Sequence, residues 1–369
     1  MKIAYDYQIF SMQAFGGISR YYQILANELL TLNQDVSFFA GIHQNYYLSK
    51  FRSSVVSGIK IPRYPPKTGR LFRELNNFYS EALINAKKPD IVHETYYSPC
   101  FSHVSDVARV ATVHDMIHEL FPSCFPEKDK TSYFKRRTVN RVDRIICISE
   151  STRNDLISCF DIDEDKISTV YHGVDLSRFK VSGVLENPNR RPFILYVGNR
   201  SGYKNFSGFL EAYASSPRLK KDFDVVAFGG GSWTSSEKGM MSGLGIDSHR
   251  IHHVSGSDDL LAEYYAKAHL FVYPSLYEGF GLPPLEAMAA GCPVVTSNTS
   301  SMPEVVREAG EYFSPNDMES IQTSLEEVAY SASRRDQLVE LGYTNIRDFS
   351  WTRCAKETLD VYRNTIGQP

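Results

Sequence analysis

Apolar residues recur along the chain in two patterns: short continuous runs typical of buried strands, and longer segments with the spacing of an amphipathic helix. In the first half of the chain we predict strands from Lys2 and at 36–40, 89–93, 108–113 and 144–149, with a helix at 21–30. In the second half we predict strands at 193–197, 225–228, 270–273 and 293–296, and helices at 205–214, 260–268, 284–290 and 319–332. Strands that alternate with helices favour parallel sheets covered by helices on both faces.

The same alternation occurs twice, and a polar stretch with prolines and asparagines at 183–192 separates the two occurrences. A chain of 369 residues suits two domains rather than one. We therefore predict an α/β protein with parallel-sheet domains at 1–180 and 181–350 that face a central cleft, and a final helix within 351–369 that Ser350 caps. Ligands of such sheets bind beyond the carboxyl ends of the strands.

Composition narrows the class of protein. Apolar residues make up 42% and charged residues 22%, as in soluble enzymes, and a net charge of −3 gives no basic field for nucleic acid. The six cysteines form no CxxC pair, which argues against a zinc site or a disulfide framework. There is no signal-peptide layout and no apolar run of membrane-spanning length. We expect a cytoplasmic protein, for which surface contact with a membrane stays open.

The segment 273–289 carries the clearest chemistry: an apolar strand, a loop with glycines, and a helix that two prolines open. The loop amides can turn toward one point at the start of this helix, where a diphosphate binds well. Glu278 precedes the loop and Glu286 follows it, and carboxylates accept hydrogen bonds from vicinal hydroxyls, so one acid suits a sugar and the other a ribose. The alternative for Glu286 is a carboxylate that the helix dipole favours.

Retaining GT-B glycosyltransferases of family 4 have a signature that this segment resembles in its block EGFGLPPLEAMAAGCPVV. The resemblance implies two Rossmann-like domains, donor binding mainly in the C-terminal one, no metal, and a last helix that packs back on the N-terminal domain. It implies that Glu278 contacts the hydroxyls of the transferred sugar and that Glu286 binds the nucleotide ribose. The loop between them would face sugar and phosphate with the amides of Gly279, Phe280, Gly281 and Leu282.

A second segment of the resemblance is the stretch VGNRSGYKN at 197–205, which contains Arg200 and Lys204. In the family, the two cations of this segment bind the donor diphosphate. Such cations stabilise the negative charge that develops on the leaving phosphate when no metal is present. The alternative is that both are solvated surface cations.

The N-terminal half contributes two further candidates. Its stretch FGGISRYYQILANELL resembles the first helix start of bacterial mannosyltransferases, which implies that Gly16 and Gly17 approach the β-phosphate and line the acceptor site. His114 ends a predicted strand, and the matching histidine of the family approaches the transferred sugar. The alternatives are a simple turn for the glycines and a buried core histidine for His114.

The remaining predictions concern the ligands. The nucleobase is expected on small groups of the second domain, where Ser255 follows a strand end. The stretches FGGISRYY and VHDMIHELFP resemble mannosyltransferases of O-antigen and capsule assembly, which implies GDP-mannose as donor and an oligosaccharide or lipid-linked acceptor. The alternatives are a UDP-sugar donor, an epimerase of GT-B fold, and a non-catalytic protein that binds sugar nucleotides.

Two basic stretches lie in the first half of the chain. One comprises Lys135–Arg137, Arg141 and Arg144, and the other Arg63, Lys67, Arg70 and Arg73 with Leu71 and Phe72 between them. One interpretation is that each stretch meets anionic lipid head groups or a lipid-diphosphate acceptor. The alternative is that each is a solvated helix face.

Overall fold

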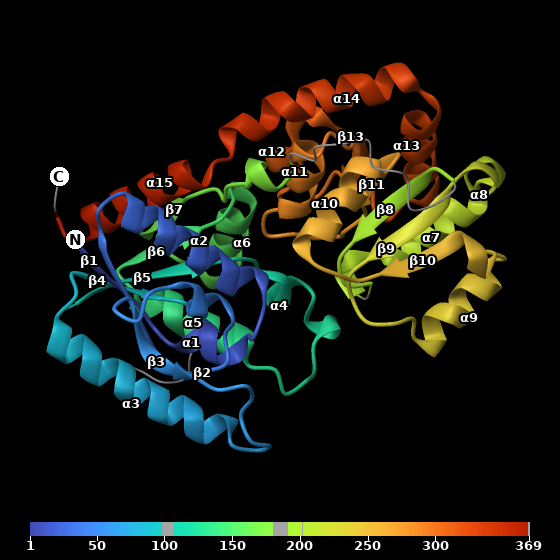
Figure 1. Cartoon of the computed structure of the whole chain (residues 1–369). Helices are drawn as coiled ribbons and strands as arrows, with labels where there is room; N and C mark the ends of the chain where they lie inside the picture. Colours follow the sequence, from blue (N-terminus) through green and yellow to red (C-terminus); the bar gives the residue numbers. More distant parts are fainter. Residues whose placement is uncertain (98–106, 180–190, 201, 368–369) are drawn as a thin grey trace. The chain divides into compact units, whose positions relative to one another are not determined.

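The computed structural model describes residues 1–97, 107–179, 191–200 and 202–367. Contacts divide the chain into two compact units (Figure 1): unit 1 comprises Met1–Tyr171 and Trp351–Pro369, and unit 2 comprises His172–Ser350. Each unit is built on one parallel sheet with helices on both faces. The predicted fold class, α/β with two Rossmann-like parallel-sheet domains, is confirmed.

Unit 1 has seven parallel strands in the order β3-β2-β1-β4-β5-β6-β7. The strands are β1 Lys2–Tyr5, β2 Asp35–His43, β3 Val56–Lys60, β4 Ile91–Glu94, β5 Ala108–Val113, β6 Arg144–Cys147 and β7 Ile167–Thr169. The α-helices are α1 Gln8–Met12, α2 Gly17–Thr31, α3 Gly69–Lys87, α4 Ile117–Leu120, α5 Thr131–Arg141, α6 Glu150–Phe160 and α15 Trp351–Thr365. Three short 3₁₀ segments are η1 Tyr47–Lys50, η2 Pro122–Cys124 and η3 Glu164–Lys166. The strand order reverses between β1 and β4, which makes the gap beyond their carboxyl ends the switch point of this sheet.

Unit 2 has six parallel strands in the order β10-β9-β8-β11-β12-β13, with its switch point between β8 and β11. The strands are β8 Phe193–Val197, β9 Asp224–Phe228, β10 Ile251–Val254, β11 Leu270–Tyr273, β12 Val294–Ser297 and β13 Gly310–Phe313. The α-helices are α7 Phe206–Ser215, α8 Pro217–Asp222, α9 Ser235–Gly243, α10 Asp258–Lys267, α11 Leu282–Ala289, α12 Met302–Val306, α13 Met318–Tyr330 and α14 Ala332–Asn345. The 3₁₀ segments are η4 Leu176–Phe179, η5 Gly202–Lys204, η6 Ser248–Arg250, η7 Arg307–Ala309 and η8 Ile346–Asp348.

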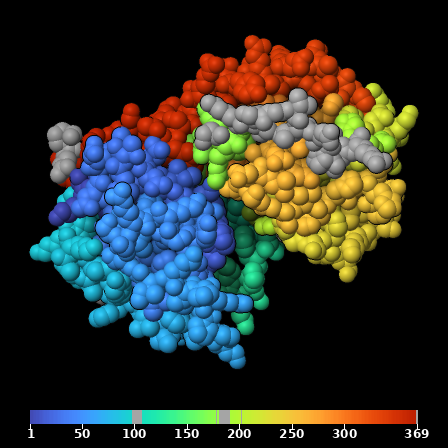
Figure 2. All heavy atoms as spheres, viewed as in Figure 1, coloured from blue at the N-terminus to red at the C-terminus, as the bar shows by residue number. Residues whose placement is uncertain are grey.

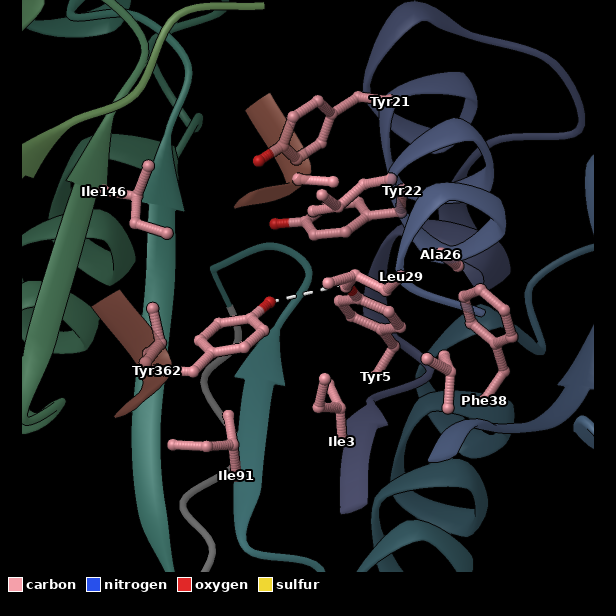
Figure 3. Packing of buried hydrophobic residues seen from close by; sticks show 14 of the residues in the cluster. Ile3, Tyr5, Tyr21, Tyr22, Ala26, Leu29, Phe38, Ile91, Ile146 and Tyr362 are labelled. Carbon is pink, nitrogen blue, oxygen red and sulfur yellow. Dashed lines mark hydrogen bonds between the residues drawn. The ribbon is translucent and has the colours of Figure 1, made fainter. Parts of the chain in front are cut away.

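The last helix, α15, belongs to the core of unit 1 (Figure 3). Its Tyr362 is fully buried, and the Tyr362 hydroxyl lies 3.4 Å from the hydroxyl of Tyr5 on β1. The same hydroxyl lies 2.6 Å from Nδ1 of His93, whose Nε2 lies 2.9 Å from Thr112 Oγ1. The C-terminal residues of the chain thus complete a core whose sheet is made by the first half of the sequence.

The sequence pattern locates the central strands well and the sheet edges poorly. Strands β5, β8 and β11 have the predicted bounds. The strands that the pattern did not predict, β3, β7 and β13, are all edge strands. Each is partly exposed along its length, so none leaves a continuous apolar run in the sequence.

Two differences from the prediction concern the end of one helix and the start of unit 2. The helix predicted at 319–332 is α13, which ends at Tyr330, and α14 was not predicted. The two helices are separate because Ser331 is extended and its hydroxyl accepts a hydrogen bond from Arg334 N at 3.2 Å, which starts α14. Unit 2 begins at His172 rather than at 181, because η4 packs within unit 2, where Phe179 contacts the ring of Tyr265. Of the predicted linker, residues 183–190 lie outside the described residues.

Candidate functional site

The switch point of unit 2 brings together Lys204 and Glu278. Lys204 lies in the segment that follows β8, and Glu278 lies in the loop that follows β11. Because β8 and β11 are adjacent parallel strands, both segments leave the sheet at the same edge. Lys204 Nζ is 2.6 Å from Glu278 Oε1, and the two side chains are 18% and 10% exposed. A cation and a carboxylate are therefore paired where ligands of this kind of sheet bind.

Two buried tyrosines lie near this ion pair. Lys204 Nζ lies 3.5 Å from the hydroxyl of Tyr273, the last residue of β11. Burial raises the pKa of Tyr273 well above its usual range, and the charge of Glu278 raises it further. Burial and then Glu278 raise the pKa of Tyr196 on β8 in the same way. Both phenols therefore stay neutral, and the charge at the switch point is that of the lysine and the glutamate.

Two serines hold the Glu278 loop in place. The Ser300 hydroxyl accepts a hydrogen bond from Glu278 N at 2.9 Å. The Ser301 hydroxyl donates to the carbonyl oxygens of Glu278 at 2.9 Å and Phe280 at 2.7 Å. The sequence analysis missed both serines, although the signal was present: a run of hydroxyl and amide residues, SNTSS at 297–301, directly follows a predicted strand.

The start of helix α11 faces the same loop. Gly281 precedes the helix with φ +112°, and a Cβ added there would lie 2.4 Å from Met302 Cε, so glycine is needed for both conformation and space. The helix begins at Leu282, earlier than predicted, because Pro283 and Pro284 fit a first turn. No side chain caps this turn, which leaves the positive end of the α11 dipole for an anionic group.

Glu286 lies on α11 in surroundings different from those of Glu278. Burial raises the pKa of Tyr265 on α10 well above its usual range, and the nearby Glu286 carboxylate raises it further. Glu278 is thus beside the lysine of η5, whereas Glu286 is beside a tyrosine of α10. The two acids of the motif occupy distinct positions, as their separate predicted roles require.

Arg200 forms hydrogen bonds within its own unit rather than with the Lys204–Glu278 pair. Its Nε donates to Glu237 Oε1 at 2.7 Å, and its Nη1 and Nη2 donate to the carbonyl oxygens of Gly229 at 2.9 Å and Gly231 at 2.6 Å. The guanidinium lies 4.4 Å from the ring centre of Trp233, and the side chain is only 5% exposed. Arg200 therefore fixes the glycine-rich loop after β9, beside a cavity of about 430 Å³.

Ser255 lies after β10, the edge strand of the unit 2 sheet, and is exposed. Two positions earlier, His253 of β10 has Nε2 3.2 Å from the carbonyl oxygen of Gly229. The ends of β9 and β10 are thus connected at the edge of the sheet where Arg200 also bonds.

His114 and the glycine pair lie in unit 1. His114 follows β5 and is buried, with its ring 5.2 Å from that of Tyr21 on α2. Burial, with smaller contributions from His93 and Lys135, lowers the pKa of His114 to about 3. The imidazole is therefore neutral near pH 7, where it exchanges hydrogen bonds but does not act as an acid.

Gly16 and Gly17 lie at the start of α2, the helix whose Tyr21 contacts His114. Gly16 is extended, with φ 169°, a conformation open to any residue. The Gln13 side chain packs against Gly16, where an added Cβ would lie 2.2 Å from Gln13 Oε1, and that oxygen accepts from Ser19 N at 3.3 Å in the first turn. Gly17 is exposed, and a Cβ added there would meet nothing within 4 Å. Neither backbone strain nor packing within unit 1 accounts for Gly17.

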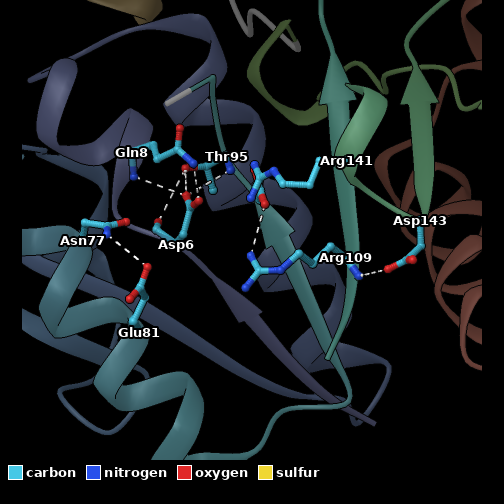
Figure 4. A network of polar contacts seen from close by, with 9 residues as sticks. Asp6, Gln8, Asn77, Glu81, Thr95, Arg109, Arg141 and Asp143 are labelled. Carbon is cyan, nitrogen blue, oxygen red and sulfur yellow. Dashed lines mark hydrogen bonds and ion pairs between the residues drawn. The ribbon is translucent and has the colours of Figure 1, made fainter. Parts of the chain in front are cut away.

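The switch point of unit 1 is filled by internal hydrogen bonds (Figure 4). Asp6 Oδ1 accepts from the hydroxyl of Thr95 at 2.6 Å and from its amide at 3.0 Å, and Asp6 Oδ2 accepts from Gln8 Nε2 at 2.6 Å. Burial, with a smaller contribution from Glu94, raises the pKa of Asp6 to about 6. This network was not predicted from the sequence, because Asp6 and Thr95 lie 89 positions apart in the chain.

A buried carboxylate next to this network, Glu94, has two arginine partners. Glu94 Oε1 is 3.1 Å from Arg109 Nη1, and Glu94 Oε2 is 2.6 Å from Arg141 Nη2. The Glu94 side chain is almost fully buried. Both oxygens of this acid are therefore neutralised by the protein itself.

Comparison with known proteins decides the family. Two family models match the chain: Glycosyltransferase Family 4 over residues 15–178, and Glycosyl transferases group 1 over residues 177–344. The O-antigen chain mannosyltransferase B of Escherichia coli is 31% identical over 281 residues, which are 73% of this chain and 74% of that protein. The chain is a family 4 glycosyltransferase. The resemblance found in the sequence is thereby confirmed.

The glycosyltransferase has further relatives. The O-antigen chain mannosyltransferase RfbU of Salmonella typhimurium is 26% identical over 305 residues, which are 80% of this chain and 81% of that protein. Sucrose-phosphate synthase from Thermosynechococcus elongatus superposes with a TM-score of 0.80 at 19% identity, and the match covers 99% of each chain. The latter similarity shows that the two enzymes share their fold.

The basic stretch at 135–144 of the glycosyltransferase is divided between buried and exposed side chains, with Arg136 and Arg137 exposed. Lys135 is buried, with Nζ 2.7 Å from Glu119 Oε2, and Arg141 pairs with Glu94. Arg136 donates to the carbonyl oxygen of Cys159 at 3.0 Å. Lys135 and Arg141 are thus neutralised within unit 1, and contact of this stretch with lipid head groups stays a prediction.

Within the described ranges, no group of three or more His, Cys, Asp and Glu side chains is placed to hold a metal ion. In those same ranges, no helix is long and apolar enough to cross a bilayer. The expectation that the glycosyltransferase needs no metal stays a prediction.

Proposed function

We propose that this glycosyltransferase transfers mannose from GDP-mannose, with retention of configuration, to an oligosaccharide or lipid-linked acceptor in cell-surface polysaccharide synthesis. The observation that carries the proposal is the Lys204–Glu278 pair at the switch point of unit 2, next to the uncapped start of α11. The choice of mannose is supported by similarity to two O-antigen chain mannosyltransferases.

The roles of the two charged side chains follow from their chemistry. The Glu278 carboxylate accepts hydrogen bonds from two hydroxyls of the donor sugar and so orients the anomeric carbon. The Lys204 ammonium and the α11 dipole stabilise the diphosphate as negative charge develops on it. In the free enzyme, each of these charges is neutralised by the other at 2.6 Å. Donor binding exchanges this internal partner for the sugar hydroxyls and the phosphate.

The transfer needs no enzyme nucleophile. The bond between the anomeric carbon and the phosphate oxygen breaks with both electrons going to the diphosphate. The acceptor oxygen forms the new bond on the same face, and its proton passes to the β-phosphate. Retaining glycoside hydrolases differ, because a carboxylate of theirs forms a covalent intermediate. Product anomericity by NMR tests this step, and a product of inverted configuration overturns it.

We extend the proposal to the residues of unit 1 that the family resemblance identifies. The neutral imidazole of His114 exchanges a hydrogen bond with a hydroxyl of the transferred sugar. Gly16 and Gly17 let the backbone approach the β-phosphate, and the open space around Gly17 supports this role. Glu286 binds the ribose, and Ser255 lies near the base.

Thermal shift with a panel of nucleotides tests the donor. A ligand that binds only the folded protein stabilises it by about 2.7 kcal/mol at a hundredfold excess over Kd. We expect GDP and GDP-mannose to raise the melting temperature, and UDP and UDP-glucose to leave it unchanged. A shift with UDP but none with GDP replaces GDP-mannose by a UDP-sugar. The Glu286→Gln variant is the matched control, since it should weaken GDP and GDP-mannose alike.

Transfer in the presence of a chelator tests the metal-independent part of the proposal. Lys204 supplies the charge that a divalent cation supplies in other transferases. Activity with EDTA should equal activity with added magnesium or manganese. Loss of activity with EDTA that a metal restores would contradict this role of Lys204.

A further inference from the structure

Helix α3 of unit 1 exposes an apolar face. Leu71, Leu75, Phe78 and Tyr79 are 58%, 48%, 75% and 40% exposed. Their spacing of four, seven and eight residues from Leu71 places them on one side of the helix. Every other helix in the described part of the chain carries at most one large exposed apolar side chain. We call these four residues the α3 outer face.

The opposite side of α3 fixes the helix on the sheet. The Asn76 side chain accepts a hydrogen bond from Ile42 N at 2.7 Å and donates one to Ile42 O at 2.8 Å. Ile84 lies in a buried cluster with Phe39 of β2. Figure 1 accordingly shows α3 lying along its sheet at the periphery of unit 1. The outer face is therefore held outward by a well-packed inner face.

One residue of the basic stretch at 63–73 turns inward. Phe72, expected between the basic residues, stacks on Tyr64 with ring centres 4.7 Å apart. Leu71, its neighbour, points outward and belongs to the outer face. The structure thus separates the two apolar residues of this stretch into one that packs and one that is presented to solvent.

Basic side chains lie at both ends of α3. The exposed residues Arg63, Lys67 and Arg70 are at its N-terminal end, and Lys87 and Lys88 are at its C-terminal end. Arg63, Lys67 and Arg70 form no ion pair with any residue that the structure describes. The acids on the helix are the exposed Glu74 and the half-buried Glu81, so the basic residues at its two ends outnumber them. Figure 2 shows atoms of this region, blue to cyan by sequence, at the surface of unit 1.

We propose that the α3 outer face binds the surface of an anionic lipid bilayer. Leu71, Leu75 and Phe78 would enter the boundary between head groups and acyl chains, as the apolar side of an interfacial helix does. Arg63, Lys67 and Arg70 would contact lipid phosphates. The exposed apolar side chains explain the attraction to a bilayer, and the basic ends explain the preference for an anionic one.

The same charges argue against a second copy of the chain as the occupant. Two-fold symmetric packing of α3 on itself is either antiparallel or parallel. In the antiparallel case each basic end meets the other basic end, and in the parallel case each end meets its own copy. Both arrangements place like charges together, whereas an anionic membrane complements them.

Co-sedimentation with lipid vesicles tests this surface on the full-length enzyme. The vesicles contain equal parts of phosphatidylglycerol and phosphatidylcholine, or phosphatidylcholine alone. The wild-type chain should bind the anionic vesicles more tightly, and salt at about 0.5 M should weaken this preference. The Leu75→Ser/Phe78→Ser variant should lower the partition coefficient about tenfold or more. No donor or acceptor is needed, so the outcome is independent of the proposed transfer reaction.

A matched control is Tyr343→Ser, which removes an apolar side chain of 46% exposure from α14 of unit 2. This variant should bind vesicles like the wild type, and all variants should keep the wild-type melting temperature. Wild-type protein that ignores anionic vesicles overturns the proposal, as does an equal loss with Tyr343→Ser. A light-scattering mass that falls from dimer to monomer in the double variant identifies the face as a contact between copies, and this too overturns it.

Discussion

The two units place carboxylates at equivalent points of equivalent sheets, but they treat them differently. At the switch point of unit 1, Asp6 accepts from two residues of its own unit and the adjacent Glu94 is held by two arginines. At the switch point of unit 2, Glu278 faces one lysine and a tyrosine hydroxyl, beside an uncapped helix start. Carboxylates saturated by internal donors stabilise a fold, whereas a carboxylate whose lysine partner can be exchanged is suited to a ligand.

The largest effect that this comparison predicts is on catalysis. Glu278→Gln keeps the shape of the side chain but removes the charge that orients the donor, so kcat/KM should fall about 10²–10³-fold. The melting temperature should change little. Glu311→Gln is the control, because Glu311 also forms a partly exposed ion pair in unit 2, with Arg334 at 2.8 Å. If Glu278→Gln keeps an activity within a few-fold of the wild type, Glu278 does not have the functional role that distinguishes it from Asp6 and Glu94.

The reverse effect is expected at Glu94 in unit 1. Glu94→Gln leaves Arg109 and Arg141 without their carboxylate, and breaking such a buried network should lower the free energy of unfolding by about 3 kcal/mol. Urea unfolding of Glu94→Gln and Glu278→Gln side by side measures the difference. If both variants lose the same stability, the distinction between the two switch points fails.

Coupling between Lys204 and Glu278 tests whether the two side chains act on the same bound donor. Lys204→Met should lower kcat about a hundredfold, because the leaving diphosphate loses its cation. The double variant Lys204→Met/Glu278→Gln should be little worse than the worse single variant, since the two side chains act on one bound donor. Steady-state kinetics of the four proteins gives the coupling energy. Strictly multiplicative losses would contradict a shared site.

Acid should destabilise unit 1 through its buried histidines. Burial lowers the pKa of His93 to about 3, as it does for His114, so their contribution to stability is present above pH 6.5 and is lost as the pH falls. Asp6, with its pKa raised to about 6, acts in the opposite direction, because its contribution is present at low pH and is lost as the pH rises. The two histidines outweigh the single aspartate, so acidification should lower the free energy of unfolding.

The test compares unfolding at two pH values. Between pH 7 and pH 5, His93→Gln should reduce the loss of unfolding free energy by about 2 kcal/mol relative to wild type. Asp6→Asn should increase that loss instead. An unchanged pH dependence in His93→Gln would show that His93 is not the buried neutral group described here.

The smallest effects concern the glycines at the two helix starts. Gly281→Ala forces a side chain into a left-handed conformation against Met302, so we expect a loss of about 1–2 kcal/mol. Gly17→Ala meets open space, so its stability should stay within about 0.5 kcal/mol of wild type while donor affinity falls. Thermal unfolding without GDP measures the stability of each variant, and the shift on addition of GDP measures its donor affinity. Full donor affinity in Gly17→Ala would limit the site to unit 2.

The central strands of the two sheets and the positions of Lys204 and Glu278 can be predicted from the sequence. Continuous apolar runs mark β5, β8 and β11 because central strands are buried on both faces, whereas the exposed edge strands β3, β7 and β13 leave no such run. Local spacing also placed Glu278 and Lys204 at strand ends, and two strand ends meet when the strands are neighbours in a parallel sheet.

Pairing between distant polar residues could not be predicted. Periodicity distinguishes buried from exposed positions, but it does not say which donor will meet which acceptor. Arg200 illustrates this limit, because its partners Glu237 and Trp233 come from a different strand-to-helix connection. Asp6 and Thr95 illustrate it again in unit 1, where they are 89 positions apart in the chain.

The place of α15 in the chain has a consequence for biosynthesis. Unit 2 is a continuous segment whose two ends are joined by the hydrogen bond from Val174 N to Phe349 O at 3.0 Å. All its residues leave the ribosome before α15 does. Domains commonly complete folding in the order of synthesis. Here the second unit should fold first, while the nascent first unit keeps an incomplete core until α15 and its Tyr362 have been synthesised.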